Sequence, residues 1–283
     1  EFKKGVMDYF NECYANCITP NPCVECNKKI KFGLLYKKAL ELGCFYVSTG
    51  HYAKTEYSEK YKRWVITKAT SRKKDQTYVM YKVEPELVEH MMFPLANYEN
   101  KDEIRKIADE AGLVNVAHKS DSEDICFIPD NDYKKFLRET YGVNPIEGDI
   151  VDKNGRVLGK HKGLYGYTVG QRRGLGIANA VPLFVTGFNR EKNQLIVGEA
   201  DDLLKDSMIC YDINLLLIDK LEVPTRVMIK TRYTQQEVSG IVEMYGEDKF
   251  KVTFDEPQPR ITPGQSAVFY VDDILFGGGK ILG

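Results

Sequence analysis

The sequence predicts an α/β protein of several domains that ends in a small β-barrel. Three observations lead to this prediction: a length of 283 residues, helix and strand patterns that alternate in the first half, and short alternating strands near the C-terminus. Apolar residues make up 43% and charged residues 29%, which is ordinary for a globular protein. A chain of this length is long enough for two or three domains, each with its own core.

Helix and strand signals follow each other closely in the first part of the chain. Residues 33–43 carry leucines and alanines at helical spacing and end on Gly43, which predicts a helix with a glycine C-cap. Residues 44–49 then predict a buried strand, with Gly50 at its carboxyl end. This order of helix, strand and glycine is typical of α/β domains that bind a nucleotide at the strand ends.

Two further helices and a hairpin are predicted downstream. Asn100 with Glu103 forms a capping-box pattern ahead of apolar residues at helical spacing, and a second helix is expected over residues 131–141. An Asn-Gly pair within residues 148–157 predicts a β-hairpin. The sequence becomes glycine-rich from this point, which indicates a small mixed domain.

The last part of the chain alternates between apolar and polar residues, as the strands of a small barrel do. The expected strands are residues 227–233, 238–245, 250–254 and 266–271. We therefore expect three domains, over residues 1–143, 144–206 and 207–283.

Charge and hydropathy limit the possible partners. Forty basic and 41 acidic residues give a net charge of −1, so an RNA surface would have to be a local patch. Four basic runs are candidates, although any one of them is more often a solvated face: residues 28–31, 60–63, 72–74 and 171–173. No apolar run approaches the roughly 20 residues of a membrane span, and the N-terminal residues do not resemble a signal peptide. We expect a cytoplasmic protein with no membrane partner.

Seven cysteines, an odd number without a secretion signal, argue against a disulfide scaffold and favour metal or redox chemistry. Cys23 and Cys26 form a Cys-x-x-Cys pair ahead of a helix and near lysines, where thiols shift toward the reactive thiolate. Cys126 stands alone in a second segment. Cys44 and Cys210 lie among apolar residues and are expected to be buried. By itself the pair is compatible with thioredoxin-like redox, zinc and iron–sulfur sites.

Five motifs occur together and in order: Thr-Pro-Asn-Pro-x-x-x-Cys-Asn-x-x-Ile-Lys-Phe (19–32), Ser-Thr-Gly-His-Tyr-Ala (48–53), Lys-Asp-Gln-Thr-Tyr (74–78), Asp-Ser-x-x-Ile-Cys-Phe-Ile (121–128) and Gly-Gln-Arg-Arg-Gly-Leu-Gly (170–176). With Lys-Thr-Arg-Tyr (230–233) in the last domain, the series closely resembles the tRNA-specific 2-thiouridylase family over essentially the whole chain. The resemblance implies a partial adenine-nucleotide α-hydrolase-like domain of the PP-loop ATP pyrophosphatase type, which is the catalytic domain. A small mixed α/β central domain that binds tRNA and a C-terminal β-barrel would follow it.

The resemblance also implies a reaction. In this family ATP, with Mg²⁺, adenylates the C2 carbonyl oxygen of the wobble uridine in tRNA, and sulfur then displaces AMP to give 2-thiouridine. The implied partners are the anticodon loop of tRNA and a sulfur donor such as a cysteine desulfurase or a sulfur-relay protein.

Residue roles carry over where the motifs match. Cys126 resembles the cysteine that receives sulfur as a persulfide, Cys26 resembles the partner that helps to release that sulfur, and Gly50 resembles a nucleotide contact. Asn21, Pro22 and Cys23 match the stretch that contacts the target base, and the matched tRNA contacts are Lys74, Asp75, Gln76, Arg232 and Tyr233. From pattern alone Gly50 could serve a tight turn, Arg232 and Tyr233 could be an ordinary strand end, and His51 is more often structural than catalytic.

The sequence departs from the family at Cys23, where many members carry Asp. Cys23, Cys26 and Cys126 could therefore hold a [4Fe-4S] cluster with one iron open for sulfide, as in related cluster-dependent tRNA thiolases. We favour this cluster, with the persulfide route as the alternative. A zinc site made of Cys13, Cys17, Cys23 and Cys26 is a third possibility, although its spacing fits no common zinc ribbon or knuckle.

A second departure concerns the phosphates of ATP. The family opens with a Ser-Gly-Gly-x-Asp-Ser loop that cradles pyrophosphate, and no such motif occurs in these 283 residues. We expect the sequence to be a fragment that by itself neither releases pyrophosphate nor thiolates tRNA. Two alternatives remain at this point: another PP-loop ATP pyrophosphatase, and a non-catalytic RNA-binding metal module.

Overall fold

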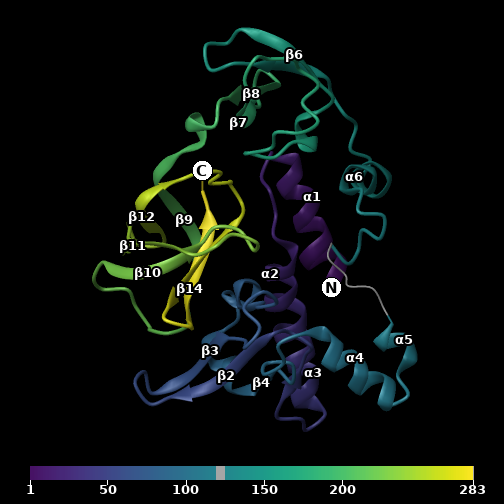
Figure 1. Cartoon of the computed structure of the whole chain (residues 1–283), viewed down its shortest axis with the longest axis vertical. Helices are drawn as coiled ribbons and strands as arrows, with labels where there is room; N and C mark the ends of the chain where they lie inside the picture. Colours follow the sequence, from purple (N-terminus) through teal and green to yellow (C-terminus); the bar gives the residue numbers. More distant parts are fainter. Residues whose placement is uncertain (119–124, 283) are drawn as a thin grey trace.

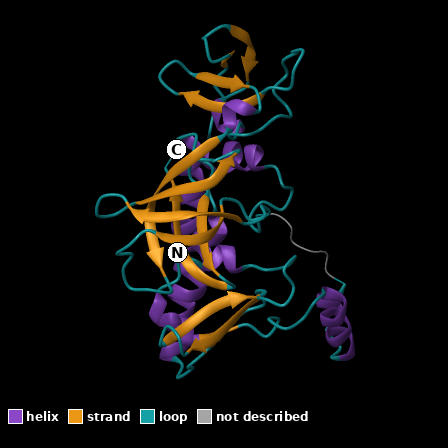
Figure 2. Ribbon diagram, turned by 60° about the vertical axis from the view of Figure 1, so that its left-hand side comes forward, coloured by secondary structure: helices purple, strands orange, loops and turns teal. Residues whose placement is uncertain are grey.

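The computed structural model describes residues 1–118 and 125–282. Three sheets are spread along the molecule, with a column of helices beside them (Figure 1). A two-stranded sheet lies beside the lower helices, an eight-stranded sheet includes the barrel, and a four-stranded sheet lies at the far end. Figure 2 shows the barrel between the other strand-rich regions.

The helical column contains the first five elements of the chain. These are η1 (Lys3–Met7), α1 (Asp8–Ala15), α2 (Pro22–Cys26), η2 (Asn27–Leu34) and α3 (Leu35–Glu41). The last three form one uninterrupted helical run, so the predicted helix over 33–43 is only its second half. The η2 segment has π-helical geometry, and a Cβ at Gly33 would lie 2.7 Å from the carbonyl oxygen of Lys28. Glycine therefore permits this wider turn, and Gly43 ends the run with a φ of +73° as predicted.

The strand predicted over residues 44–49 is much shorter than expected. Only β1 (Val47–Ser48) forms, and it pairs in parallel with β4 (Met91–Met92). Because pairing covers only two residues, Phe45 and Tyr46 lie outside the sheet and are 55% and 50% exposed. Cys44 is also exposed, and its predicted burial is wrong.

A hairpin that the sequence analysis did not identify joins the first part of the chain to the barrel. Strands β2 (Ala53–Ser58) and β3 (Arg63–Lys68) pair with each other, and Thr67 of β3 pairs with Ile274 of the barrel. Two 3₁₀ helices follow, η3 (Thr77–Met80) and η4 (Pro85–His90). The core is shared across this junction, because buried Tyr78 and Tyr81 pack in one cluster with Val268 and Tyr270.

The predicted barrel is confirmed as a closed, six-stranded one. Its strands are β9 (Lys205–Leu215), β10 (Thr225–Lys230), β11 (Val238–Met244), β12 (Phe250–Gln258), β13 (Ser266–Val271) and β14 (Ile274–Ile281), and pairing of β13 with β14 closes it. Strands β9 and β14 were not among the four expected strands, and β14 contains three consecutive glycines, which usually disfavour strands. A Cβ at Gly277 would lie 2.3 Å from the carbonyl oxygen of Asn214, so close approach of β9 requires glycine here.

The remaining sheet and helices include the predicted hairpin and both predicted helices. The four-stranded sheet has the order β6-β5-β8-β7, from β5 (Gly148–Val151), β6 (Val157–His161), β7 (Phe184–Asn189) and β8 (Gln194–Gly198). Strands β5 and β6 form the predicted hairpin. The short 3₁₀ helix η5 (Leu164–Gly166) lies between β6 and β7 in sequence, and η6 (Asp201–Leu203) follows β8.

Helix α4 (Lys101–Glu110) begins with the expected capping box, in which Asn100 accepts from the amides of Asp102 and Glu103. Helix α5 (Val114–Ala117) follows it, and α6 (Tyr133–Tyr141) is the second predicted helix. Across the described part of the chain, no helix has the length and apolar character needed to cross a bilayer.

Candidate functional site

The cysteine pair lies on α2, where the long helical run begins. Asn21 precedes the helix with a non-helical backbone, and Pro22 occupies the first turn, a favoured position for proline because its missing N–H has no helical partner there. Cys23 is exposed and Cys26 is partly exposed. Residues three apart on a helix lie on one side of it, so both thiols face the same way.

Cys126 comes from a distant part of the sequence and lies near this pair. Loss of surrounding water raises the pKa of both Cys23 and Cys26, the neighbouring thiol of Cys126 also raises both, and Lys31 lowers both without reversing the shift. Charges influence one another in this way only at short range. Cys126 is therefore close enough to Cys23 and Cys26 for their charges to interact. The shift toward thiolate expected from the sequence is wrong, because burial outweighs the effect of the lysine. Residues 121–124 of the Cys126 motif lie outside the described residues.

The sulfurs fit a cluster in chemical type but do not form an assembled metal site. Among the residues described, no three His, Cys, Asp or Glu side chains are arranged so that they could hold a metal ion. All seven cysteines are free, and Cys13 and Cys210 are buried, the latter as predicted. The zinc alternative likewise has no assembled ligand set among the described residues.

Lys31 connects the thiols to the segment after β1. Its Nζ donates to Nε2 of His51 over 3.0 Å, and Nδ1 of His51 is 2.7 Å from Oγ1 of Thr49. Burial and the adjacent Lys31 lower the pKa of His51 to about 3, so its imidazole is neutral at pH 7. A neutral ring accepts from Lys31 and donates to Thr49. His51 thereby fixes a cation beside the thiols, which is a positioning role.

Gly50 lies between these contacts. It is exposed, and it is absent from the glycines with positive φ, so the local turn does not require glycine. A Cβ there would meet only Leu95 Cδ1, at 3.8 Å. Neither backbone strain nor internal packing accounts for this glycine, which favours its predicted role beside a nucleotide.

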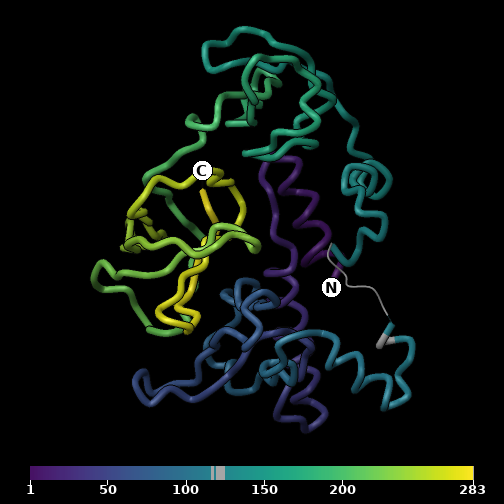
Figure 3. Tube along the Cα trace, in the orientation of Figure 1, coloured from purple at the N-terminus to yellow at the C-terminus, as the bar shows by residue number. Residues whose placement is uncertain are grey.

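The barrel holds the chain just before α2. The amide of Thr19 donates to the carbonyl of Pro263, and Nε2 of Gln265 donates to the carbonyls of Thr19 and Pro20 over 3.3 and 3.1 Å. The tube in Figure 3 shows the purple N-terminal part of the chain running beside the barrel. The stretch predicted to contact the target base is therefore supported by the C-terminal domain.

The predicted tRNA segment 74–76 includes two side chains with internal partners. The carboxylate of buried Asp75 accepts from the amide of Ala69 and from the hydroxyl of Thr77, and its pKa is raised by burial. Oε1 of Gln76 accepts from the amide of Tyr52 over 2.9 Å. Asp75 and Gln76 thus shape the loop, and Lys74 is half-exposed.

Arg232 and Tyr233 follow β10 at the barrel end. Nη2 of Arg232 donates to the carbonyls of Val169 and Arg260, so this guanidinium joins the barrel to the central domain. Its Nε is buried and has no hydrogen-bond partner among the residues that the structure describes. Tyr233 is 40% exposed, and its ring meets that of Tyr78 at a centroid distance of 6.0 Å. Of the two, Tyr233 has the more accessible surface for a base or sugar.

Several charged residues near the site have internal partners that the sequence analysis did not predict. The basic run 28–31 was considered as an RNA patch, yet Lys28 pairs with Glu84, Lys29 with Glu25 and Lys31 with His51. Glu25 itself lies between the two cysteines and is 2% exposed. The sequence did contain an indication of this buried ion pair: a glutamate inside a Cys-x-x-Cys pair, at the start of a lysine-rich helix.

Comparison with known proteins gives consistent matches along the chain. Residues 1–130 match the family model described as tRNA methyl transferase HUP domain, residues 134–199 the tRNA methyl transferase PRC-barrel domain, and residues 205–281 the Aminomethyltransferase beta-barrel domain. The chain is 46% identical over 280 residues to the tRNA-specific 2-thiouridylase MnmA of Clostridioides difficile (strain 630), covering 99% of this chain and 77% of that protein. Similar proteins of the same printed name occur in Carboxydothermus hydrogenoformans (44% identity, 76% of that protein) and Acetivibrio thermocellus (43%, 77%). In both, the match also covers 99% of this chain.

Proposed function

Because this chain belongs to the tRNA-specific 2-thiouridylase family, we propose that it catalyses the ATP-dependent replacement of the C2 oxygen of a tRNA uridine by sulfur. The observation that carries the proposal is the match over 99% of this chain to a protein named tRNA-specific 2-thiouridylase, and the mutual electrostatic influence of Cys126 with Cys23 and Cys26 supports it. The match to a HUP domain supports ATP as the activating nucleotide, and Mg²⁺ is the ion we expect with it.

We propose that adenylation comes first and sulfur transfer second. Attack of the C2 oxygen on ATP releases pyrophosphate and turns that oxygen into part of an AMP leaving group. The terminal sulfur of a Cys126 persulfide then attacks C2 and AMP departs, which leaves a disulfide between the base and Cys126. The thiolate of Cys26 attacks Sγ of Cys126, the electron pair of the old S–S bond moves to the sulfur on C2, and a thiol reductant later opens the Cys26–Cys126 disulfide.

The surrounding residues support this chemistry. Lys31 favours the thiolate form of Cys26, the form that attacks sulfur, and neutral His51 keeps that ammonium in place. We propose that Gly50 contacts the nucleotide, that Asn21, Pro22 and Cys23 contact the target base, and that Lys74, Asp75, Gln76, Arg232 and Tyr233 form or support the tRNA surface. We further propose domains over residues 1–143, 144–206 and 207–283, with the central one also contacting tRNA.

The function is tested directly with the intact protein, ATP, Mg²⁺, a persulfide donor and tRNA that lacks the modification. We expect 2-thiouridine in digested tRNA, together with AMP and pyrophosphate in equal amounts. Formation of AMP without thiouridine would indicate a different PP-loop ATP pyrophosphatase. tRNA binding without any AMP would indicate a non-catalytic module.

Substituting Cys23 by aspartate distinguishes the two sulfur carriers. Three thiols are the minimum set for a [4Fe-4S] cluster with an open iron, whereas the persulfide route uses only Cys26 and Cys126. Because the described residues contain no assembled ligand set, we expect Cys23→Asp to retain thiolation within about tenfold. The measurement is thiouridine formation after anaerobic reconstitution, beside iron and sulfide analysis. Loss of both bound iron and activity in Cys23→Asp would establish the cluster route instead.

A further inference from the structure

A carboxylate inside the cysteine pair faces away from the thiols and into the protein. Glu25 lies between Cys23 and Cys26 on α2 and is 2% exposed, whereas Cys23 is exposed. At about 100° of rotation per residue, the two cysteines lie on one side of the helix and Glu25 on the other. Anything that fixes the Glu25 side chain therefore also fixes the direction in which the thiols point.

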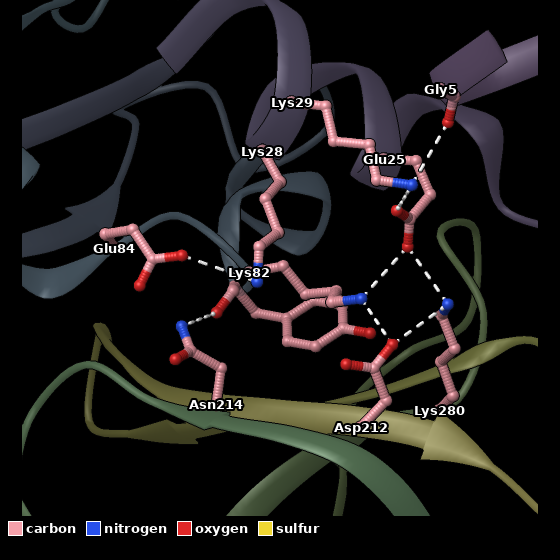
Figure 4. A network of polar contacts seen from close by, with 10 residues as sticks. Gly5, Glu25, Lys28, Lys29, Lys82, Glu84, Asp212, Asn214 and Lys280 are labelled. Atoms are coloured by element: carbon pink, nitrogen blue, oxygen red, sulfur yellow. Dashed lines mark hydrogen bonds and ion pairs between the residues drawn. The ribbon is translucent and has the colours of Figure 1, made fainter. Parts of the chain in front are cut away.

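Glu25 is held by an alternating ring of four charges (Figure 4). Its Oε1 accepts from Nζ of Lys82 over 2.9 Å and from Nζ of Lys280 over 3.0 Å. The same two ammonium groups reach Oδ2 of Asp212, over 2.5 Å and 3.0 Å. Two carboxylates and two ammonium groups thus neutralise each other, and Lys29 adds a contact of 2.8 Å to Oε2 of Glu25.

The ring joins α2 to the barrel through a local distortion of β9. Gly278 pairs with Asn214 and Lys280 with Tyr211, so the register shifts between them and Asp212 lies at the irregularity. Asp212 has a φ of +50°, a left-handed conformation that is uncommon for a non-glycine residue. Such bulges redirect a side chain, and here the carboxylate meets Lys82 and Lys280.

Lys82 is fixed in its backbone as well as in its side chain. Nδ2 of Asn214 donates to the carbonyls of Tyr81 and Val83, the residues on either side of Lys82, over 2.7 and 2.9 Å. The side chain of Lys82 is 5% exposed and that of Glu25 is 3% exposed. A pair so well shielded from water keeps its geometry better than the exposed pairs of the surface, which contribute little.

We propose that this ring positions the reacting sulfurs: Asp212 and Lys280 of the barrel, together with Lys82, set the rotation of α2 by way of Glu25 and so direct Cys26 toward Cys126. Glu25 is a positioning residue, because it acts through the helix and touches no reacting atom. The inference rests on the proposed function for its purpose, but the positioning itself is a property of the thiols and is measurable without catalysis.

The test compares Glu25→Gln with the unsubstituted intact protein by two readouts. The first is the rate of iodoacetamide labelling of Cys26 divided by that of exposed Cys44, determined on peptides by mass spectrometry. Loosening of α2 exposes the half-buried thiol, and we expect this ratio to rise about tenfold. The second is thiolation kinetics, where we expect kcat to fall roughly tenfold or more and KM for tRNA to stay within about twofold, because misplacement affects the chemical step.

Matched variants separate positioning from general stability. Val252→Ala weakens the buried barrel core without touching the four charges, and we expect its labelling ratio to stay unchanged. Lys280→Met should behave like Glu25→Gln, whereas Lys280→Arg keeps the charge and should restore most of kcat. An unchanged ratio in both Glu25→Gln and Lys280→Met, or an equal rise in Val252→Ala, overturns the proposal. If the unsubstituted protein forms no thiouridine, the proposed function fails, and the labelling ratios still decide the positioning role.

Discussion

Replacing either Cys26 or Cys126 by serine is expected to lower thiouridine formation by about 10³-fold or more, the scale of losing a catalytic nucleophile. A serine hydroxyl cannot hold a persulfide at position 126, and at position 26 it cannot attack the S–S bond as a thiolate does. Adenylation precedes both steps, so ATP-dependent release of pyrophosphate should continue in both variants. The measurement is thiouridine and pyrophosphate in the same reaction.

The matched control for these variants is Cys44→Ser. Cys44 is exposed and lies after α3, outside the site, so its loss should change neither product. Equal thiolation by Cys26→Ser and the unsubstituted protein would contradict the two-cysteine route. The two variants also differ in a useful way: only Cys26→Ser should accumulate tRNA joined to the protein by a reducible bond through Cys126.

Replacing Gly264 by valine should have the largest structural effect. Gly264 has a φ of +85°, and a Cβ there would lie 2.0 Å from Cγ2 of Ile18 and 2.9 Å from the carbonyl oxygen of Thr19. A left-handed conformation costs a side-chain-bearing residue about 1–2 kcal/mol, and the steric clash adds to this. If strain and clash together lower the free energy of unfolding by about 3 kcal/mol, the melting temperature should fall by roughly 6–12 °C.

A control at Gly246 isolates the clash from the backbone strain. Its φ is +72° and nothing lies within 4 Å of an added Cβ, so Gly246→Val carries the strain alone. We expect the smaller loss of thermal stability in that variant, and only Gly264→Val should also impair thiolation, because Thr19 and Pro20 lead into α2. Equal melting temperatures in the two variants would show that Ile18 moves aside.

Much of the fold could be predicted from sequence because its signals are local. The capping box at Asn100, the hairpin at 148–157 and four alternating barrel strands each depend on residues a few positions apart. Strand β14 could not be predicted in this way, because its glycines are explained only by the approach of β9. The strand predicted over 44–49 failed because its pairing partner β4 offers only two residues.

The candidate site was predictable to a similar degree. The resemblance identified the cysteines, but it could not indicate that Lys31 and neutral His51 form a pair beside them. Helical i,i+4 spacing connects Glu25 with Lys29, but Lys82 and Lys280 come from distant parts of the sequence that no spacing rule connects with it. Arg232 was predicted as a tRNA contact from its motif. In the structure its guanidinium group donates hydrogen bonds to backbone carbonyls in two domains.

The contacts between the barrel end and the start of α2 also constrain the order of folding. The hydrogen bonds from Gln265 to Thr19 and Pro20 join residues 246 and 245 positions apart. Pairings of such long sequence separation form late and slowly, because a long loop must close before they contribute. The cysteine-bearing segment, although it is made before the barrel, therefore reaches its final geometry only after the last strands of the barrel have been synthesised and packed. Until then its thiols lack the support of the barrel and are most open to oxidation.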